Sequence, residues 1–239
     1  MATRDKGIEG HSPVPARSRK HAAARWPAFI AIVVMLVIYS VTPSNLVPRA
    51  ILIVLSAIIL LTMVLFNPRR SGIESGIMRW GAIILSILLL AFNLVDVVYI
   101  VSDLIAGNSK GPQVLLEAAE VWVANVIAFS VVYWEMDRGG PVARGELARA
   151  QLPAADFKFP QDDERAAVSE VKRDSATSRA NWRPGYIDYL YLALTNMMAF
   201  TPNDVVPLTA RAKILMGIQG LSGFVILALV IGRSVNILA

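Results

Sequence analysis

The 239-residue chain is 55% hydrophobic and only 17% charged, with a formal net charge of +5. A soluble domain of this length cannot bury so much apolar surface, so the composition predicts an integral membrane protein. The absence of cysteine excludes disulfides and thiolate metal sites and leaves the compartment open. The basic residues lie mostly beside the ends of apolar runs, which favours a role in membrane topology over nucleic-acid binding.

The chain begins with a basic tail, residues 1–25, which is predicted to be disordered. Apolar runs then predict a four-helix membrane region over residues 26–136, with helices at 27–42, 50–66, 80–106 and 113–134. Arginines cluster in the tail and in the connection 67–79, so the positive-inside rule places both in the cytoplasm. The turn at 106–112 is then expected on the outer side.

Residues 137–185 are polar, with charges of both signs interleaved and no sustained apolar period. This pattern predicts a largely disordered cytoplasmic loop. Within it, the segment Asp156 to Pro160 (DFKFP) places two phenylalanines on one side of an extended chain. We expect these side chains to dock the loop on the membrane surface.

The C-terminal part, residues 186–239, joins a short aromatic helix, a proline-bounded TPNDVVP loop and a long apolar helix. With the upstream FPQDDE segment, residues 159–164, this arrangement resembles the uncharacterised bacterial DUF1345 membrane protein family. The likeness is best over the last third of the chain. It implies a membrane protein and no defined activity.

The same stretch also resembles the pore module of potassium channels, in which a short helix leads into a Gly-Tyr-Gly-Asp filter and an inner helix. Asp204 to Thr209 (DVVPLT) match the end of that pattern, but Thr201, Pro202 and Asn203 replace the filter's Gly, Tyr and Gly. Filter carbonyls turn into the pore at positive φ, which Pro202 does not adopt, so the filter is degenerate. If the protein conducts, it should discriminate weakly between potassium and sodium.

The charge distribution favours a fifth span over a pore helix. Because the loop before it is predicted to be cytoplasmic, Tyr186 to Phe200 should cross outward and leave Thr201 to Arg211 outside. The predicted fold class is therefore an all-α integral membrane protein: a bundle of about six transmembrane helices with one polar cytoplasmic loop. It is expected to lie in the inner membrane as a multi-pass protein with both termini cytoplasmic. The lipid bilayer is the expected partner, and homo-oligomer formation stays open.

Carboxylates near the outer half of the bundle are the candidate ion pathway: Asp96 and Asp103 on the third helix, Glu117 and Glu120 on the fourth, and Asp204 in the last loop. Ionisable groups inside a membrane are costly and often mark routes for ions or protons. Asp96 is the deepest of the five. The alternative is a structural network of ion pairs or hydrogen bonds that holds helices together.

Small residues recur on the last helix at Gly217, Gly220 and Gly223. Such residues let membrane helices pack closely, and a pore hinge is the alternative. There is no P-loop, H-E-x-x-H motif, nucleophile elbow or His/Cys metal spacing, so we expect no enzyme, no cofactor and no metal.

Two functions from different classes follow. The first is channel-like or carrier-like transport of a monovalent cation or proton, without a potassium-selective glycine filter. The second is a non-transporting membrane scaffold or interaction protein.

Overall fold

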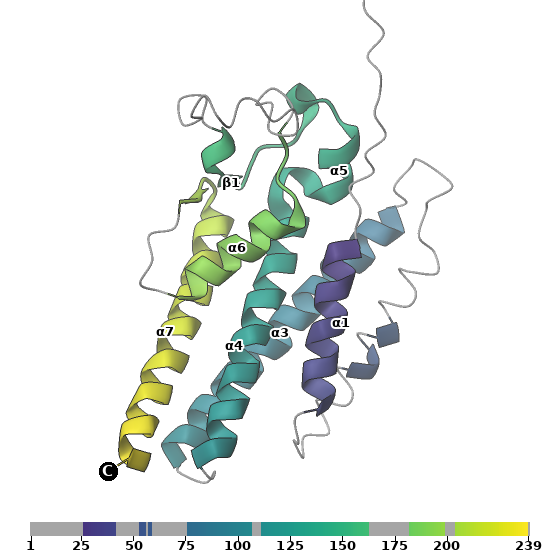
Figure 1. The fold of residues 1–239 in the computed structure, drawn as a ribbon. Helices are drawn as coiled ribbons and strands as arrows, with labels where there is room; N and C mark the ends of the chain where they lie inside the picture. Colours follow the sequence, from purple (N-terminus) through teal and green to yellow (C-terminus); the bar gives the residue numbers. More distant parts are fainter. Residues whose placement is uncertain are drawn as a thin grey trace, which may run out of the picture.

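The computed structural model describes residues 26–41, 53–55, 57–58, 76–106, 111–162, 182–198 and 204–238. Most of this part of the chain is helical (Figure 1). Its α-helices are α1 Trp26–Val41, α3 Gly76–Ala106, α4 Gly111–Met136, α5 Gly140–Glu146, α6 Tyr186–Met197 and α7 Ala210–Leu238. Residues 53–55 and 57–58 are also helical. The basic tail 1–25 and the filter-like residues Thr201, Pro202 and Asn203 lie outside the described residues, so the predictions made for them stay predictions.

Helix α4 is the centre of the bundle. It packs against α3, α6, α7 and α1, and its residues Ala124, Ala128, Phe129 and Tyr133 are completely buried (Figure 1). Two stretches of the described chain, Leu116–Gly145 and Ala210–Gly232, are helical, long and apolar enough to cross a membrane. Shorter apolar helices cover Ala28–Ser40 and Ile83–Tyr99.

Helix α6 enters the bundle and does not cross it. It begins beside the end of α4, where the Tyr186 and Trp134 rings meet edge to face at 5.7 Å. After α6 the chain returns to the same end, because β2 (Val206–Pro207) pairs antiparallel with β1 (Phe157–Lys158). The twelve residues of α6 span about 18 Å, well short of a membrane core. The predicted fifth span over Tyr186 to Phe200 is therefore wrong.

Helix α7 runs antiparallel to α4, so the last described turn of α7 lies at the same end of the bundle as the end of α3 and the start of α4 (Figure 1). The charge pattern of the sequence predicts that the turn at 106–112 lies outside and the C-terminus inside the cell. These two predictions cannot both hold, because both features lie at one end of the bundle. The predicted separation of Thr201 to Arg211 from the loop after α4 is also wrong, since Arg211 binds Asp156.

Residues 137–162 are ordered, which corrects the prediction of a largely disordered loop for this half of the segment. They form η1 (Asp137–Gly139), α5, η2 (Arg149–Gln151), β1 and η3 (Pro160–Asp162). The remainder, 163–181, lies outside the described residues. Order arises because charged side chains of this segment are paired, as Arg138 is with Asp162 and Asp156 is with Arg211.

The two phenylalanines of the DFKFP segment lie on one side of β1, with Lys158 exposed between them, as predicted. They are buried in the protein, however, and are not exposed for docking on a membrane surface. Phe157 packs edge to face on Tyr133 at 5.1 Å, and Phe159 packs on Tyr189 at 5.3 Å. The segment is thus held by an aromatic core at the end of α4.

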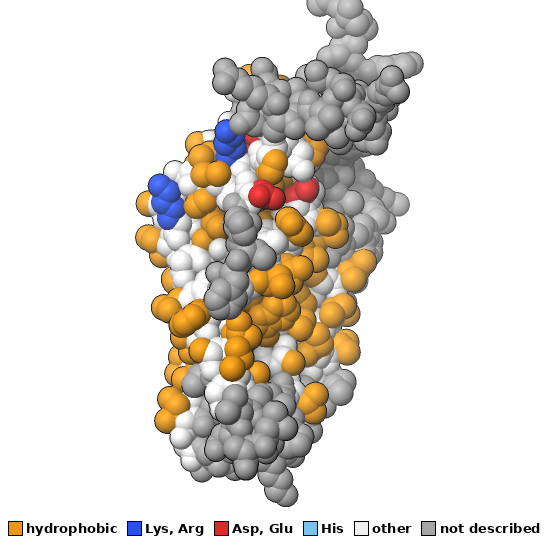
Figure 2. All heavy atoms as spheres, turned by 60° about the vertical axis from the view of Figure 1, so that its left-hand side comes forward, with side chains coloured by type: hydrophobic (Ala, Val, Ile, Leu, Met, Phe, Trp, Pro, Cys, Tyr) orange, Lys and Arg blue, Asp and Glu red, His pale blue; other side chains and the backbone are white. Residues whose placement is uncertain are grey.

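The surface along α6 and α7 is strongly apolar. Figure 2 shows that charged side chains on this face gather toward one end of the molecule, while apolar side chains cover much of the rest. The large exposed hydrophobic residues described on these helices are Ile187, Tyr191, Ile214, Ile218, Leu221, Phe224 and Ile231. Such a surface is typical of contact with lipid or with another apolar partner.

Candidate functional site

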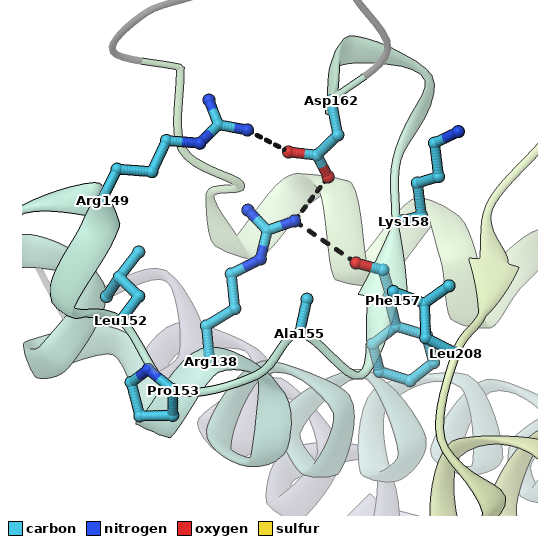
Figure 3. A pocket seen from close by; sticks show the side chains of 9 residues that line it. All are labelled: Arg138, Arg149, Leu152, Pro153, Ala155, Phe157, Lys158, Asp162 and Leu208. Atoms are coloured by element: carbon cyan, nitrogen blue, oxygen red, sulfur yellow. Dashed lines mark hydrogen bonds and ion pairs between the residues drawn. The ribbon is translucent and has the colours of Figure 1, made fainter.

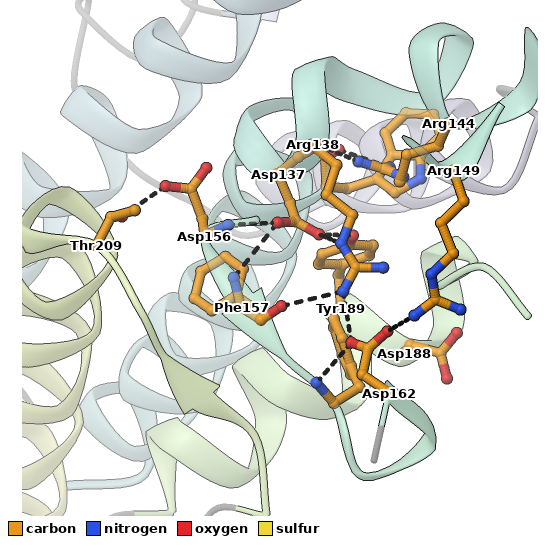
Figure 4. Close-up of polar contacts among 12 residues, drawn as sticks. Asp137, Arg138, Arg144, Arg149, Asp156, Phe157, Asp162, Asp188, Tyr189 and Thr209 are labelled. Carbon is orange, nitrogen blue, oxygen red and sulfur yellow. Dashed lines mark hydrogen bonds and ion pairs between the residues drawn. The ribbon is translucent and has the colours of Figure 1, made fainter. Parts of the chain in front are cut away.

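A group of charged and hydroxyl side chains, which we call the Asp137 cluster, lies at the end of α4 (Figure 4). It consists of Asp137, Arg138, Arg144, Arg149, Asp156, Asp162, Tyr189, Thr209 and Arg211.

Asp137 is completely buried. Its Oδ1 accepts the backbone N–H groups of Asp156, at 2.7 Å, and of Phe157, at 3.3 Å. Its Oδ2 accepts the Tyr189 hydroxyl at 2.5 Å. Burial raises the pKa of Tyr189 well above its ordinary value, so the phenol stays protonated and donates. Asp137 therefore joins α4 to β1 and α6.

Arg144 caps the end of α4 from α5. Its guanidinium donates to the carbonyl oxygens of Asp137 at 2.5 Å and Trp134 at 2.8 Å, and it lies 5.0 Å from the centre of the Tyr189 ring. The last carbonyls of a helix lack partners within the helix, and a cation there also complements the helix dipole. This contact explains how an arginine only 2% exposed is accommodated.

Asp156 is the second completely buried carboxylate. Arg211 binds it in a fork, with Nε at 2.7 Å and Nη2 at 2.6 Å, and the Thr209 hydroxyl donates to it at 2.5 Å. Forked arginine–carboxylate pairs are strong and geometrically specific. This pair fixes the start of α7 to β1, which lies 55 residues earlier in the chain.

The chain reverses direction after α4 through three residues with positive φ: Arg138 at 50°, Gly139 at 78° and Gly140 at 90°. A non-glycine residue in this region is strained, and contacts of its side chain must compensate. Arg138 binds Asp162 and donates to the Phe157 carbonyl oxygen at 3.3 Å.

Arg149 reaches the same Asp162 carboxylate at 2.9 Å. These residues line an open cavity of about 350 Å³. Figure 3 shows both arginines pointing toward Asp162, with Lys158 on the opposite side of Asp162 from Arg149. Because this carboxylate accepts from both arginines, one part of the cavity wall is built from ion pairs. The Asp137 cluster as a whole acts as a structural clamp that holds the end of α4 to β1, α6 and the start of α7.

A second polar feature, the interhelical network, lies deeper between α4, α6 and α7. Its centre is Gln219, which is completely buried. The Gln219 Oε1 accepts the Tyr133 hydroxyl at 2.8 Å and the Asn196 amide at 2.9 Å, and its Nε2 donates to the Ala193 carbonyl at 3.0 Å. Each of the three helices thus contributes a polar group to one site.

The network continues along α7 toward α3. The Asn125 amide donates to Ser222 Oγ at 3.1 Å, and Ser222 donates to the carbonyl oxygen of Gln219 at 2.8 Å. One helical turn before Asn125 on α4, the Val121 carbonyl accepts the amide of Asn93 from α3 at 3.3 Å. Buried polar side chains therefore link all four of these helices.

The predicted carboxylates do not form one site. Glu120 is buried at 6% exposure, and Asp96 and Glu117 are half-buried, on the two helices that form the α3–α4 hairpin. Asp204 is exposed beside β2, at the opposite end of the bundle, so the structure does not group it with the others. The side chain of Asp103 lies outside what the structure describes. Among the described residues, no group of three or more His, Asp or Glu side chains is placed to hold a metal ion.

The three glycines of α7 differ in their surroundings. A Cβ on Gly223 would lie 2.5 Å from the Met197 carbonyl oxygen, so this glycine permits the close approach of α6 to α7. A Cβ on Gly220 would come no nearer than 3.9 Å to the Asn196 carbonyl, and one on Gly217 would meet nothing within 4 Å. Close packing is therefore seen at Gly223 and not at Gly217.

The neutral residues of the interhelical network were not predicted from the sequence. Asn93, Asn125, Gln219 and Ser222 stand inside apolar runs, and that position was the signal that could have found them. Comparison with family models, with curated proteins and with solved structures finds no match. The resemblances to the DUF1345 family and to potassium-channel pores therefore rest on the quoted residues.

Proposed function

We propose that the protein is a multi-pass membrane protein that transports a cation or a proton without a potassium-selective glycine filter. The observation that carries the proposal is a series of polar side chains along α4 and directly after it: Glu117, Glu120, Asn125, Ser130 and Tyr133 on α4, and Asp137 in η1. Glu117 is half-buried and the others are buried. At 1.5 Å per residue this series extends for about 30 Å, the thickness of a membrane core. Buried polar groups at such depth are costly in lipid and mark routes for ions and protons.

The re-entrant helix α6 supports the proposal. Its last turn, with Asn196, contacts the buried Gln219 on α7. Transport proteins often form substrate sites where a short or broken helix ends inside the bundle. The carbonyl end of a helix carries a partial negative charge, which favours a cation.

The orientation follows from the same charges. Arg138, Arg144 and Arg149 lie at the Asp137 cluster, and Arg211 joins it through Asp156. The positive-inside rule therefore favours a cytoplasmic position for this end of the bundle. The α3–α4 connection and the C-terminus are then on the outer side, with the N-terminal tail inside as the sequence predicts. In this arrangement the carboxylates Asp96, Glu117 and Glu120 lie nearer the outer side.

The scaffold remains the second candidate, and one observation favours it. The two most buried carboxylates, Asp137 and Asp156, have hydrogen-bond donors on both oxygens and serve to hold the fold. A protein with this clamp but no flux would act through its surfaces.

Flux from liposomes tests the proposal. Purified protein should support potassium, sodium or proton flux above that of empty liposomes. Glu120→Gln and Asp96→Asn should each lower this flux severalfold, whereas the exposed control Asp204→Asn should leave it unchanged. Absence of flux for all three ions in the wild type, at matched incorporation, would leave the scaffold as the better function.

A further inference from the structure

We propose that Asn93, Asn125 and Ser222 form a binding site for a monovalent cation between α3, α4 and α7. The inference deepens the proposed transport function and rests on it for its biological role. It starts from two buried amide oxygens, Oδ1 of Asn93 and Oδ1 of Asn125, that have no hydrogen-bond partner within the part of the chain that the structure describes.

The orientation of the Asn93 amide is set by its neighbour. Its Nδ2 donates to the Val121 carbonyl at 3.3 Å, and a carbonyl oxygen can only accept. Turning the amide over would replace this bond with two facing oxygens. The side chain is completely buried, so Oδ1 is an acceptor that water outside the bundle does not reach.

The orientation of the Asn125 amide follows from the hydroxyl that it contacts. Ser222 donates its hydrogen to the Gln219 carbonyl at 2.8 Å, so Ser222 Oγ must accept from Asn125 Nδ2 at 3.1 Å. Oδ1 of Asn125, which is also completely buried, is left as a second acceptor.

The two amides belong to one region of the bundle. The Asn93 amide lies against Val121, and Asn125 follows Val121 by four residues, so both face the same side of α4 one turn apart. Buried carbonyl groups without partners are rare in folded proteins, and two of them beside neighbouring turns of α4 indicate a ligand that offers positive charge or hydrogens.

The charge around the amides selects a cation. Within five residues of Asn93, Asn125 and Ser222 along their helices, the ionisable side chains are Asp96 and Glu120, and both are acidic. Divalent metals favour sites with several carboxylates, imidazoles or thiolates, whereas amide and hydroxyl oxygens suit weakly bound hard cations. A monovalent alkali cation fits this donor set best.

Thermal unfolding of the purified full-length protein tests the site. The chlorides of lithium, sodium, potassium, rubidium and caesium would each be compared with N-methylglucamine chloride at equal ionic strength. A cation present at about ten times its dissociation constant should raise the Tm by roughly 3–6 °C, as expected for a ligand that binds only the folded state. The tryptophans of the chain provide the fluorescence signal.

Variants locate the effect. Asn125→Leu and Asn93→Leu remove one acceptor each at similar volume and should abolish most of the cation-dependent shift. Ser130→Ala is the matched control, because Ser130 is buried on the same helix and fully hydrogen-bonded, and it should keep the shift. Asn125→Asp adds a negative charge without a large change in shape and should lower the cation concentration at which the Tm shift is half complete. This variant still tests the site if the leucine variants do not fold.

Three results would overturn the site: no alkali cation shifts the wild-type Tm, the shift survives in both leucine variants, or Asn125→Asp leaves the concentration dependence unchanged. Each would indicate that the amides hold a water molecule only. Liposome flux separates this inference from the proposed function. A cation-dependent Tm without flux keeps the site and refutes transport, whereas flux that is unaffected by Asn125→Leu keeps transport and refutes the site.

Discussion

Substitution of Asp137 should be the most destabilising change in the clamp at the end of α4. Asp137→Ala would leave three buried donors without an acceptor: the N–H groups of Asp156 and Phe157 and the Tyr189 hydroxyl. Each unsatisfied buried donor costs about 1–3 kcal/mol, so the sum is about 3–9 kcal/mol. That is comparable with the whole stability of a typical domain of about 5–15 kcal/mol, and we expect little folded protein.

Asp137→Asn is the more informative variant. Its Oδ1 can still accept both backbone N–H groups, but the amide nitrogen faces the tyrosine hydroxyl and the negative charge beside Arg138, at 3.6 Å, is lost. We expect a loss of about 2–4 kcal/mol, which for a chain of this size lowers the Tm by roughly 4–16 °C.

Tryptophan fluorescence on heating the purified protein measures this change. The exposed Asp204→Asn is the control and should change the stability by less than about 0.5 kcal/mol. A Tm for Asp137→Asn within about 2 °C of the wild type would refute the argument, because it would show that neither the charge nor the tyrosine contact contributes to folding.

Two further pairs of variants test other contacts by the same measurement. Gly223→Ala should destabilise the protein by about 1–3 kcal/mol, because the added methyl group would meet the Met197 backbone, whereas Gly217→Ala should be neutral or stabilise by up to about 1 kcal/mol. The reverse order would contradict the described packing of α6 on α7. Arg211→Gln should cost about 1–3 kcal/mol, less than a fully buried pair would, because the arginine side chain is 63% exposed and water can partly replace it. Lys213→Gln, on the exposed side of the same helix turn, should have no measurable effect on stability. Equal losses of stability in Arg211→Gln and Lys213→Gln would show that the contact of Arg211 with Asp156 is unimportant.

Several elements could be predicted because their signal is local. The long apolar runs mark α3, α4 and α7, and the short AGNSKGP turn requires α3 and α4 to be antiparallel neighbours. The alternation of Phe157, Lys158 and Phe159 correctly indicates that the two rings share a side. Only the identity of what they pack against was missed.

The clamp could not be predicted because its contacts join distant parts of the chain. Asp137 meets Tyr189 across 52 residues, and Asp156 meets Arg211 across 55. In the sequence, the same charges resemble a solvated loop, and burial becomes favourable only once each charge has found its partner. The interleaved signs of residues 137–185 are compatible with either outcome.

The return of the chain after α6 to the end of α4 was missed for a different reason. Charge counting assigns a loop to one side of a membrane and then assumes that each apolar run crosses it. Tyr186–Met197 is short enough to turn back, and the decisive contact is the pairing of Val206 with Lys158. That pairing depends on a two-residue strand that has no strand-like pattern of its own.

The residues that flank the segment 163–181, Asp162 and Trp182, lie close together, and this suggests a site for inserting a reporter. Asp162 accepts the backbone N–H of Phe159 at 3.1 Å, and Trp182 packs on the Phe159 ring at 5.8 Å. A compact reporter protein whose own termini are adjacent could therefore replace part of this segment without separating β1 from α6. A fluorescent or protease-cleavable insert there would report which compartment the clamp faces in living cells, with both natural termini left unmodified.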